Sequence, residues 1–130
     1  MELSEKKKIL VVDDDLDTVE ILRIKLEGAG FKIIVGRDGQ ECLDKCQSEE
    51  PNLIIVDVMM PKISGFKAVK LLKSDKRFEN MPIILLTART QEADRQMAEA
   101  IEADGYITKP FDPDGVLKQV KELLEKIGRK

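Results

Sequence analysis

The chain has 130 residues, a net charge of −3 and no histidine. This length suits one domain with a substantial core, and the negative charge argues against direct binding of nucleic acid. Without histidine, Ser–His and Cys–His catalysis are excluded. Cys42 and Cys46 alone are too few for a zinc site, so we interpret them as reduced core residues.

No apolar run approaches the about 20 residues that span a bilayer. The segment 1–8 is charged and lacks the apolar stretch of a signal peptide. We therefore expect a soluble cytoplasmic protein with no membrane contact.

Short β-branched runs alternate along the chain with amphipathic segments. The predicted strands are Lys8–Val12, Phe31–Val35, Leu53–Asp57, Ile83–Leu86 and Tyr106–Thr108. A segment with apolar residues at helical spacing follows each strand, and these predicted helices begin at or near Leu16, Asp38, Phe66, Thr90 and Pro113.

Local signals support several of these boundaries. Gly28 and Gly30 follow the first predicted helix, as expected for its C-terminal end. Asp38 with Glu41 three residues later has the form of a capping box. Asp112-Pro113 places a cap residue before a proline at the first helical position.

This β-α alternation predicts the α/β class: a doubly wound, five-stranded parallel sheet with five helices. We expect the flavodoxin-like strand order 2-1-3-4-5, one of the two common orders of this architecture. No linker or repeat interrupts the pattern, so residues 1–130 are predicted to form a single domain. Its ordered core is expected over about 8–128, after a charged lead-in at 1–7.

Polar residues close four of the five predicted strands. They are Asp13-Asp14 after the first strand, Asp57 at the end of the third, Thr87 after the fourth and Lys109 after the fifth. In a parallel sheet with the expected order these ends share one edge, with the first and third strands adjacent. The three carboxylates should then converge beside one lysine.

A group of carboxylates at close range needs a cation to offset its repulsion. All-oxygen ligands favour Mg²⁺, which commonly meets a substrate phosphate. A metal, a lysine, a threonine hydroxyl and one carboxylate nucleophile suit phosphoryl transfer. Each residue could instead be a separate helix cap or turn residue, an alternative that weakens when four strand ends share the pattern.

The same residues resemble the receiver domain of bacterial two-component response regulators, in particular the single-domain type of chemotaxis and sporulation regulators. The matching motifs are Ile9–Asp15, Asp57 with Met60-Pro61 and Gly65, Thr87-Ala88, and Lys109-Pro110. They occur in the family order and together cover nearly the whole chain.

This resemblance implies a role for each site residue. Asp57 would be the phosphoacceptor, and Mg²⁺ (or Mn²⁺) would be bound by Asp14, Asp57 and the backbone carbonyl of Met59, with Asp13 acting mainly through water. Thr87, Ala88 and Lys109 would contact the phosphoryl group, the bond to Pro110 would be cis, and Tyr106 would be the switch aromatic.

The resemblance also implies partners. The phosphoryl donor would be a sensor histidine kinase, a histidine phosphotransfer protein or a small molecule such as acetyl phosphate. The output partner would bind the face formed by the fourth helix, fifth strand and fifth helix of a monomer that could dimerise on phosphorylation. The domain would assist its own phosphorylation and dephosphorylation without turning over an external substrate.

Two other functions remain open at this point. An aspartyl phosphatase would need a second aspartate two residues after the nucleophile, where this chain has Met59. A receiver-like docking module that is never phosphorylated would usually lack one of the acidic residues, the threonine or the lysine. All of these are present here.

Overall fold

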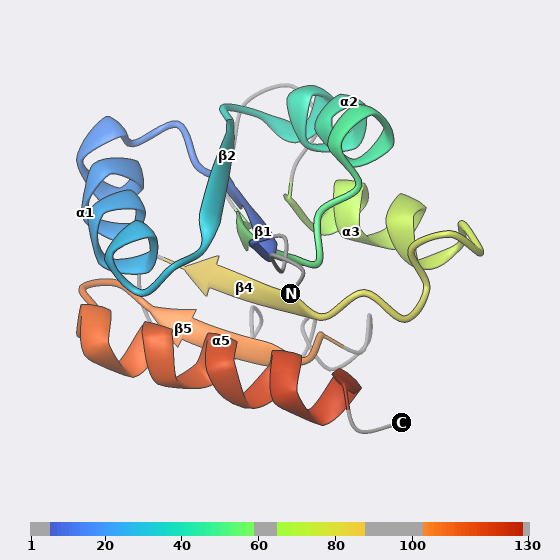
Figure 1. Ribbon diagram of the computed structural model, residues 1–130. Helices are drawn as coiled ribbons and strands as arrows, with labels where there is room; N and C mark the ends of the chain where they lie inside the picture. The colour runs from blue at the N-terminus through green and yellow to red at the C-terminus, as the bar shows by residue number, and fades with distance from the viewer. Residues whose placement is uncertain (1–5, 59–64, 88–102, 129–130) are drawn as a thin grey trace.

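The protein is built on one parallel sheet. The computed structural model describes residues 6–58, 65–87 and 103–128. The strands are β1 (Lys8–Val12), β2 (Lys32–Gly36), β3 (Leu53–Asp57), β4 (Ile83–Thr87) and β5 (Gly105–Thr108). They pair in parallel in the order β2-β1-β3-β4-β5 (Figure 1), which confirms the predicted α/β class and strand order.

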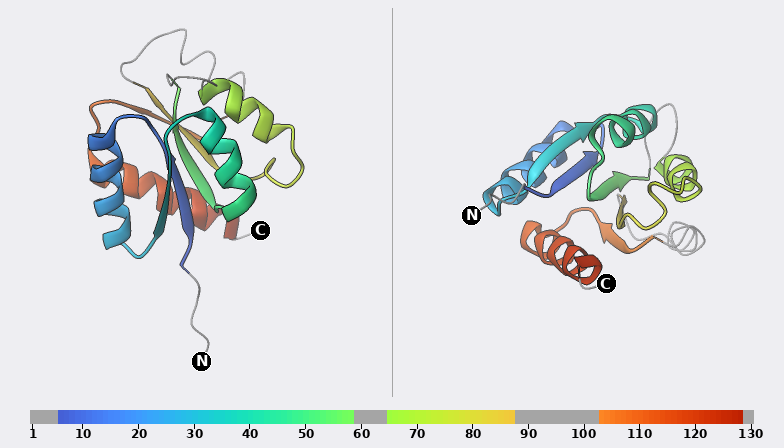
Figure 2. Two further views of the ribbon diagram at one scale, coloured as in Figure 1. Left: turned by 90° about the horizontal axis from the view of Figure 1, so that it is seen from above. Right: turned by 45° about the vertical axis from the view of Figure 1, so that its right-hand side comes forward.

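Helices cover both faces of this sheet. They are α1 (Leu16–Gly28), α2 (Gly39–Glu49), α3 (Gly65–Lys73) and α5 (Pro113–Gly128). Helices α1 and α5 lie on one face, and α2 and α3 lie on the other (Figure 2). The helix predicted from Thr90 falls in 88–102, outside the described residues. None of the helices in the described ranges is long and apolar enough to span a bilayer.

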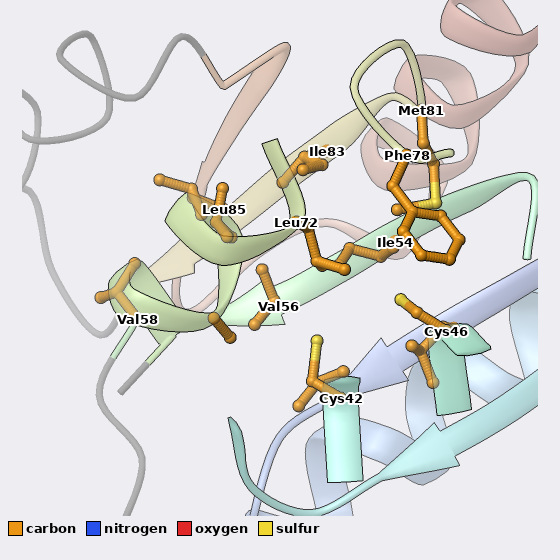
Figure 3. Close-up of a cluster of buried hydrophobic side chains, with 14 of the residues drawn as sticks. Cys42, Cys46, Ile54, Val56, Val58, Leu72, Phe78, Met81, Ile83 and Leu85 are labelled. Carbon is orange, nitrogen blue, oxygen red and sulfur yellow. The ribbon is translucent and has the colours of Figure 1, made fainter. Parts of the chain in front are cut away.

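One core lies between the sheet and helices α2 and α3. Alternate strand residues such as Ile54, Val56 and Leu85 point into it, because successive side chains of a strand point to opposite faces. Cys42 and Cys46 face these residues from α2, and both are free, buried thiols (Figure 3). The interpretation of the two cysteines as reduced core residues is confirmed.

The second core lies between the sheet and helices α1 and α5. Its strand residues are the other members of the alternation, including Val11, Ile55 and Leu86. The helices contribute Val19, Leu22, Leu26, Val116 and Val120, which are the buried positions of the predicted apolar stripes. Both faces of β3 are therefore covered, which explains its uninterrupted apolar sequence.

Three strands differ from the sequence prediction by one residue at a boundary: β2 begins and ends one residue later, β4 ends one residue later at Thr87, and β5 begins one residue earlier. Strand β2 begins at Lys32, because the Phe31 amide donates to the Leu26 carbonyl at 3.1 Å and so closes the turn after α1. This turn also uses Gly30, whose φ of 100° favours glycine. Strand β5 begins at Gly105, which pairs with Ile84.

The predicted helix starts use their capping residues. The Asp38 side chain accepts a hydrogen bond from the Glu41 amide at 2.8 Å. The Glu41 carboxylate reaches the Arg37 amide at 2.9 Å, one residue earlier than in a standard capping box. Asp112 accepts from the Asp114 amide at 3.1 Å and begins α5.

Candidate functional site

The polar strand ends meet at the carboxyl edge of the sheet. Strand β3 lies between β1 and β4, so Asp57 lies beside the residues that follow β1. Asp57 pairs in register with Leu86, and Thr87 is the next residue of β4. The amide of Val58 donates to the Leu86 carbonyl at 2.9 Å, which continues the pairing one residue beyond Asp57.

Three carboxylates form a cluster at this edge. One oxygen each of Asp13, Asp14 and Asp57 lies within 4.8 Å of the other two. Asp13 and Asp57 are buried, whereas Asp14 is exposed, so the cluster is open to solvent on one side. The predicted convergence of the three side chains is confirmed.

The ammonium group of Lys109 lies against this cluster. Its Nζ is 2.8 Å from Asp13 Oδ2 and donates a hydrogen bond of 3.1 Å to Asp57 Oδ2. The Lys109 amide also donates to the Thr87 carbonyl at 2.6 Å, and the Lys109–Pro110 peptide bond is cis. The Lys109 backbone is thus hydrogen-bonded to β4, and its side chain contacts Asp13, directly after β1, and Asp57 of β3.

Burial and charge act in opposite directions on these groups. Burial raises the pKa of Asp13 above its usual value, and the hydrogen bonds from Lys109 and from the Asp15 amide offset this only in part. For Lys109, burial lowers the pKa, but the combined effect of Asp13 and Asp57 is larger, so the pKa is raised. The lysine therefore stays protonated and provides one positive charge against three carboxylates.

The donor set fits a divalent cation. Two oxygens bound to one Mg²⁺ at 2.0–2.1 Å lie at most about 4.2 Å apart, so the 4.8 Å cluster needs only small side-chain adjustments. Asp13 Oδ2 is buried, and within the described residues its one polar partner is the Lys109 ammonium group. This oxygen therefore has a lone pair available for a further donor or a cation. The receiver family binds Mg²⁺ at an acidic pocket of this kind.

The remaining predicted site residues have different surroundings. Thr87 is buried at the end of β4. Tyr106 is partly buried and packs against the core under α2 and α3. Asp15 is exposed and caps α1, accepting from the Asp17 amide at 3.1 Å and from the Thr18 hydroxyl at 2.9 Å, which agrees with its expected role as a cap. Met59 and Ala88 lie outside the described residues.

Two features beside the cluster are not apparent from the sequence. A hollow of about 510 Å³ separates the start of α1 from the loop between β5 and α5, and Thr18, Ile21, Lys109 and Phe111 are among its lining residues. Ile21 and Ile24 of α1 are 47% and 61% exposed, although both are apolar. In the sequence, Ile21 and Ile24 are apolar but lie beside the helical spacing of the buried residues of α1. This pattern is the one sign of an exposed apolar surface that the sequence gives.

The second feature is the close approach of Gly65 to Asp57. The first residue of α3 packs directly against the backbone of Asp57 and Val58, and this space cannot hold a side chain. Gly65 belongs to the sequence motif that follows Asp57, but its contact with the Asp57 backbone depends on the tertiary fold.

Comparison with known proteins decides the family. Residues 9–121 match the response regulator receiver domain. The chain belongs to this family. Receiver domains are phosphorylation-dependent signalling domains and generally not metabolic enzymes, so neither the non-phosphorylated docking module nor the aspartyl phosphatase is favoured.

Curated relatives are similar over nearly the whole chain. The alkaline phosphatase synthesis transcriptional regulatory protein PhoP of Bacillus subtilis is 42% identical over 120 residues, which are 92% of this chain and 49% of that protein. The probable transcriptional regulator ycf27 of Cyanophora paradoxa is 40% identical over 121 residues, 93% of this chain and 49% of that protein. The chain therefore spans about half the length of these relatives.

Solved receiver structures have the same fold. The chemotaxis response regulator CheY4 of Vibrio cholerae has a TM-score of 0.85 at 33% identity, covering 92% of this chain and 99% of that one. A putative response regulator from Chloroflexus aurantiacus has a TM-score of 0.89 at 30% identity, covering 93% and 99%. The receiver fold thus extends over the sheet, both helical layers and the acidic edge.

Proposed function

We propose that this receiver domain is a signalling switch that accepts a phosphoryl group on Asp57. The observation that carries the proposal is the position of the Asp57 carboxylate, within 4.8 Å of Asp13 and Asp14 oxygens and hydrogen-bonded to Lys109 at 3.1 Å. Such an arrangement gathers the positive charge and the nucleophile that phosphoryl transfer requires. The donor is a sensor histidine kinase, a histidine phosphotransfer protein or a small acyl phosphate.

In the transfer step, a carboxylate oxygen of Asp57 forms the new bond to phosphorus. The bond from phosphorus to the donor nitrogen, or to the donor oxygen of an acyl phosphate, breaks as the leaving group departs. Asp57 reacts as a carboxylate, so no base is needed to remove a proton from it. Lys109 stays protonated and offsets charge on a phosphoryl oxygen, while the Thr87 hydroxyl donates to another.

The acidic residues would hold the metal ion. Asp14 and Asp57 would be direct ligands together with the backbone carbonyl of Met59, and Asp13 would act mainly through water. A bound Mg²⁺ (or Mn²⁺) supplies positive charge that offsets the repulsion between the phosphoryl oxygens and the carboxylates. The exposure of Asp14 supports this role, because a bound Mg²⁺ usually keeps several water ligands.

Phosphorylation would be relayed through β5 and α5. A phosphoryl group adds a charge of about −1.5 to −2, which favours movement of Thr87 towards it. Tyr106 would then turn inward and alter the face formed by the predicted fourth helix, β5 and α5, which binds the output partner. This change is a shift between two existing conformations.

The direct test is phosphorylation with acetyl phosphate and Mg²⁺, followed by intact-mass measurement. The wild-type chain should gain one phosphoryl group, and Asp57→Asn or added EDTA should prevent the gain. Asp44→Asn is the matched control, because Asp44 is an exposed aspartate on α2. Labelling that persists in Asp57→Asn would contradict the proposal, and a wild-type chain that no donor labels would favour the docking-module alternative.

A further inference from the structure

Gly65 lies in closer contact with the proposed phosphoacceptor than any side chain would allow. It is the buried first residue of α3. A Cβ atom at this position would overlap the Asp57 carbonyl oxygen and lie 2.9 Å from both the Asp57 carbonyl carbon and Val58 Cα. Non-bonded carbon atoms pack at about 3.5–4.0 Å, so a side chain here requires one backbone to move.

Neither backbone can move easily. Asp57 belongs to β3, which is paired with a strand on each side, and the next amide, of Val58, donates to Leu86 at 2.9 Å. On the other side of the contact, α3 is fixed in the core by Ala68, Val69 and Leu72. Two anchored elements therefore meet at Gly65.

The other described glycines do not share this constraint. A Cβ at Gly36 would lie 3.5 Å from its nearest neighbours, and one at Gly115 would lie 3.8 Å from Asp112. Both are ordinary van der Waals distances. At Gly105 the close neighbours are side-chain atoms: the flexible end of Gln119, which can turn away, and Ile84 Cγ1 at 3.1 Å. Among the described glycines, only Gly65 would bring a Cβ atom within 3.0 Å of backbone atoms.

We propose that Gly65 is a positioning residue for Asp57, an inference that rests on the proposed function of that aspartate. Because Gly65 has no side chain, the start of α3 packs directly on the Asp57 backbone, on the face of the sheet that α2 and α3 cover. This support holds the Asp57 carboxylate in its place relative to Asp13 and Lys109. A methyl group at position 65 displaces the carboxylate from that place.

The test compares Gly65→Ala with Gly36→Ala, both in a Gly115→Ala background that favours the α5 helix. Gly36→Ala is the matched control, since Gly36 is also a buried glycine at this edge of the sheet. The measurements are the rate of phosphorylation by acetyl phosphate at saturating Mg²⁺, the Mg²⁺ affinity by calorimetry, and amide exchange at Val58. A misplacement of about 1 Å can cost 10²-fold in rate, so we expect about a 100-fold slower rate and weaker Mg²⁺ binding for Gly65→Ala, and less than a twofold change for Gly36→Ala.

A second variant separates positioning from stability. Leu26→Ala removes a buried side chain at the end of α1, in the core on the opposite face of the sheet. At a temperature where each variant is folded by circular dichroism, Leu26→Ala should keep the wild-type rate and Val58 exchange pattern, whereas Gly65→Ala should lose both. A similar loss of rate in both variants would overturn the proposal.

The remaining outcomes are equally decisive. If the wild-type chain is not phosphorylated on Asp57, the proposed function fails, and this inference fails with it. If the wild type is phosphorylated and Gly65→Ala reacts at the same rate, only the positioning role fails. A Gly65→Ala chain that does not fold even in the stabilised background also overturns it, because Gly65 would then serve folding and not the placement of Asp57.

Discussion

Lys109 Nζ bridges two buried carboxylates, at 2.8 Å from Asp13 Oδ2 and 3.1 Å from Asp57 Oδ2. In this arrangement the lysine partly offsets the repulsion between Asp13 and Asp57 when no metal ion is bound. In the proposed mechanism the same ammonium group contacts a phosphoryl oxygen on Asp57. Lys109 would then contribute both to the stability of the unphosphorylated domain and to its reaction.

Replacing this lysine should destabilise the metal-free domain. We expect Lys109→Met to lower the free energy of unfolding by about 2 kcal/mol in EDTA, less than for a fully buried pair because Lys109 is partly exposed. Saturating Mg²⁺ should reduce this loss, since it supplies the missing charge. Urea unfolding with and without Mg²⁺ measures both values. Lys118→Met, at an exposed position of α5, is the control and should change stability by less than about 0.5 kcal/mol.

The raised pKa of Asp13 predicts a dependence of stability on pH in EDTA. Between the ordinary pKa of an aspartate and the raised value, the folded state binds more protons than the unfolded state. Stability contributed by this group is therefore lost as the pH rises through that window. Asp13→Asn should remove this part of the slope and be more stable than wild type above the window. Urea unfolding at several pH values tests this, and an unchanged slope would contradict it.

Mg²⁺ should stabilise the folded domain, because the carboxylate cluster exists only in the native state. At a concentration 100 times its dissociation constant, a ligand of the native state adds about 2.7 kcal/mol. We expect a rise in Tm with Mg²⁺ or Mn²⁺ that EDTA reverses. Asp14→Asn should diminish the rise, whereas Asp17→Asn, an exposed residue of α1, should preserve it. Equal rises in the two variants would argue against a metal site at the cluster.

The single tyrosine offers a direct report on the conformational switch. The chain has no tryptophan and one tyrosine, Tyr106, so tyrosine fluorescence comes from this position alone. Phosphorylation with acetyl phosphate and Mg²⁺ should change its intensity, because the ring would move into a more buried environment. Asp57→Asn should show no change, and Tyr106→Phe should abolish the signal. Constant fluorescence in a fully phosphorylated wild-type chain would show that Tyr106 is not the switch.

The cap of α2 should contribute to stability independently of the site. Asp38→Ala removes the acceptor of the Glu41 amide, and the loss of such a cap costs about 1 kcal/mol. Asp38→Asn retains a side-chain acceptor and should cost less. Thermal unfolding of the two variants beside wild type makes the comparison, and equal losses would assign the effect to the charge of Asp38 and not to the cap.

Much of the fold is encoded locally and could be predicted. The bounds of β1 and β3 agree with the sequence prediction because their apolar runs are sharply ended by charged residues or turn residues. The sequence predicts the start of β2 one residue too early. Phe31 is as compatible with a strand as with the turn after α1, in which its amide donates a hydrogen bond. Such a choice depends on the backbone conformation at Gly30.

The convergence of the polar strand ends was predictable for a different reason. Strand order determines which strand ends are neighbours, and so it brings Asp13, Asp57 and Lys109 together. The hollow beside α1 and the contact of Gly65 were not predictable, because both depend on how elements distant in sequence pack. The spacing of Ile21 and Ile24 indicated a helix, but their exposure emerges only when the neighbouring helix is placed.

The central position of β3 has a consequence for how a structural change at Asp57 spreads through the domain. This strand has a hydrogen-bonded neighbour on each side, whereas β5 has one in the part of the chain that is described. Strand β5 also has only four residues, whereas each of the other described strands has five. Strand β5 is therefore held by fewer strand-to-strand hydrogen bonds than β3, and we expect a structural change that begins at Asp57 to displace β5 more than β3.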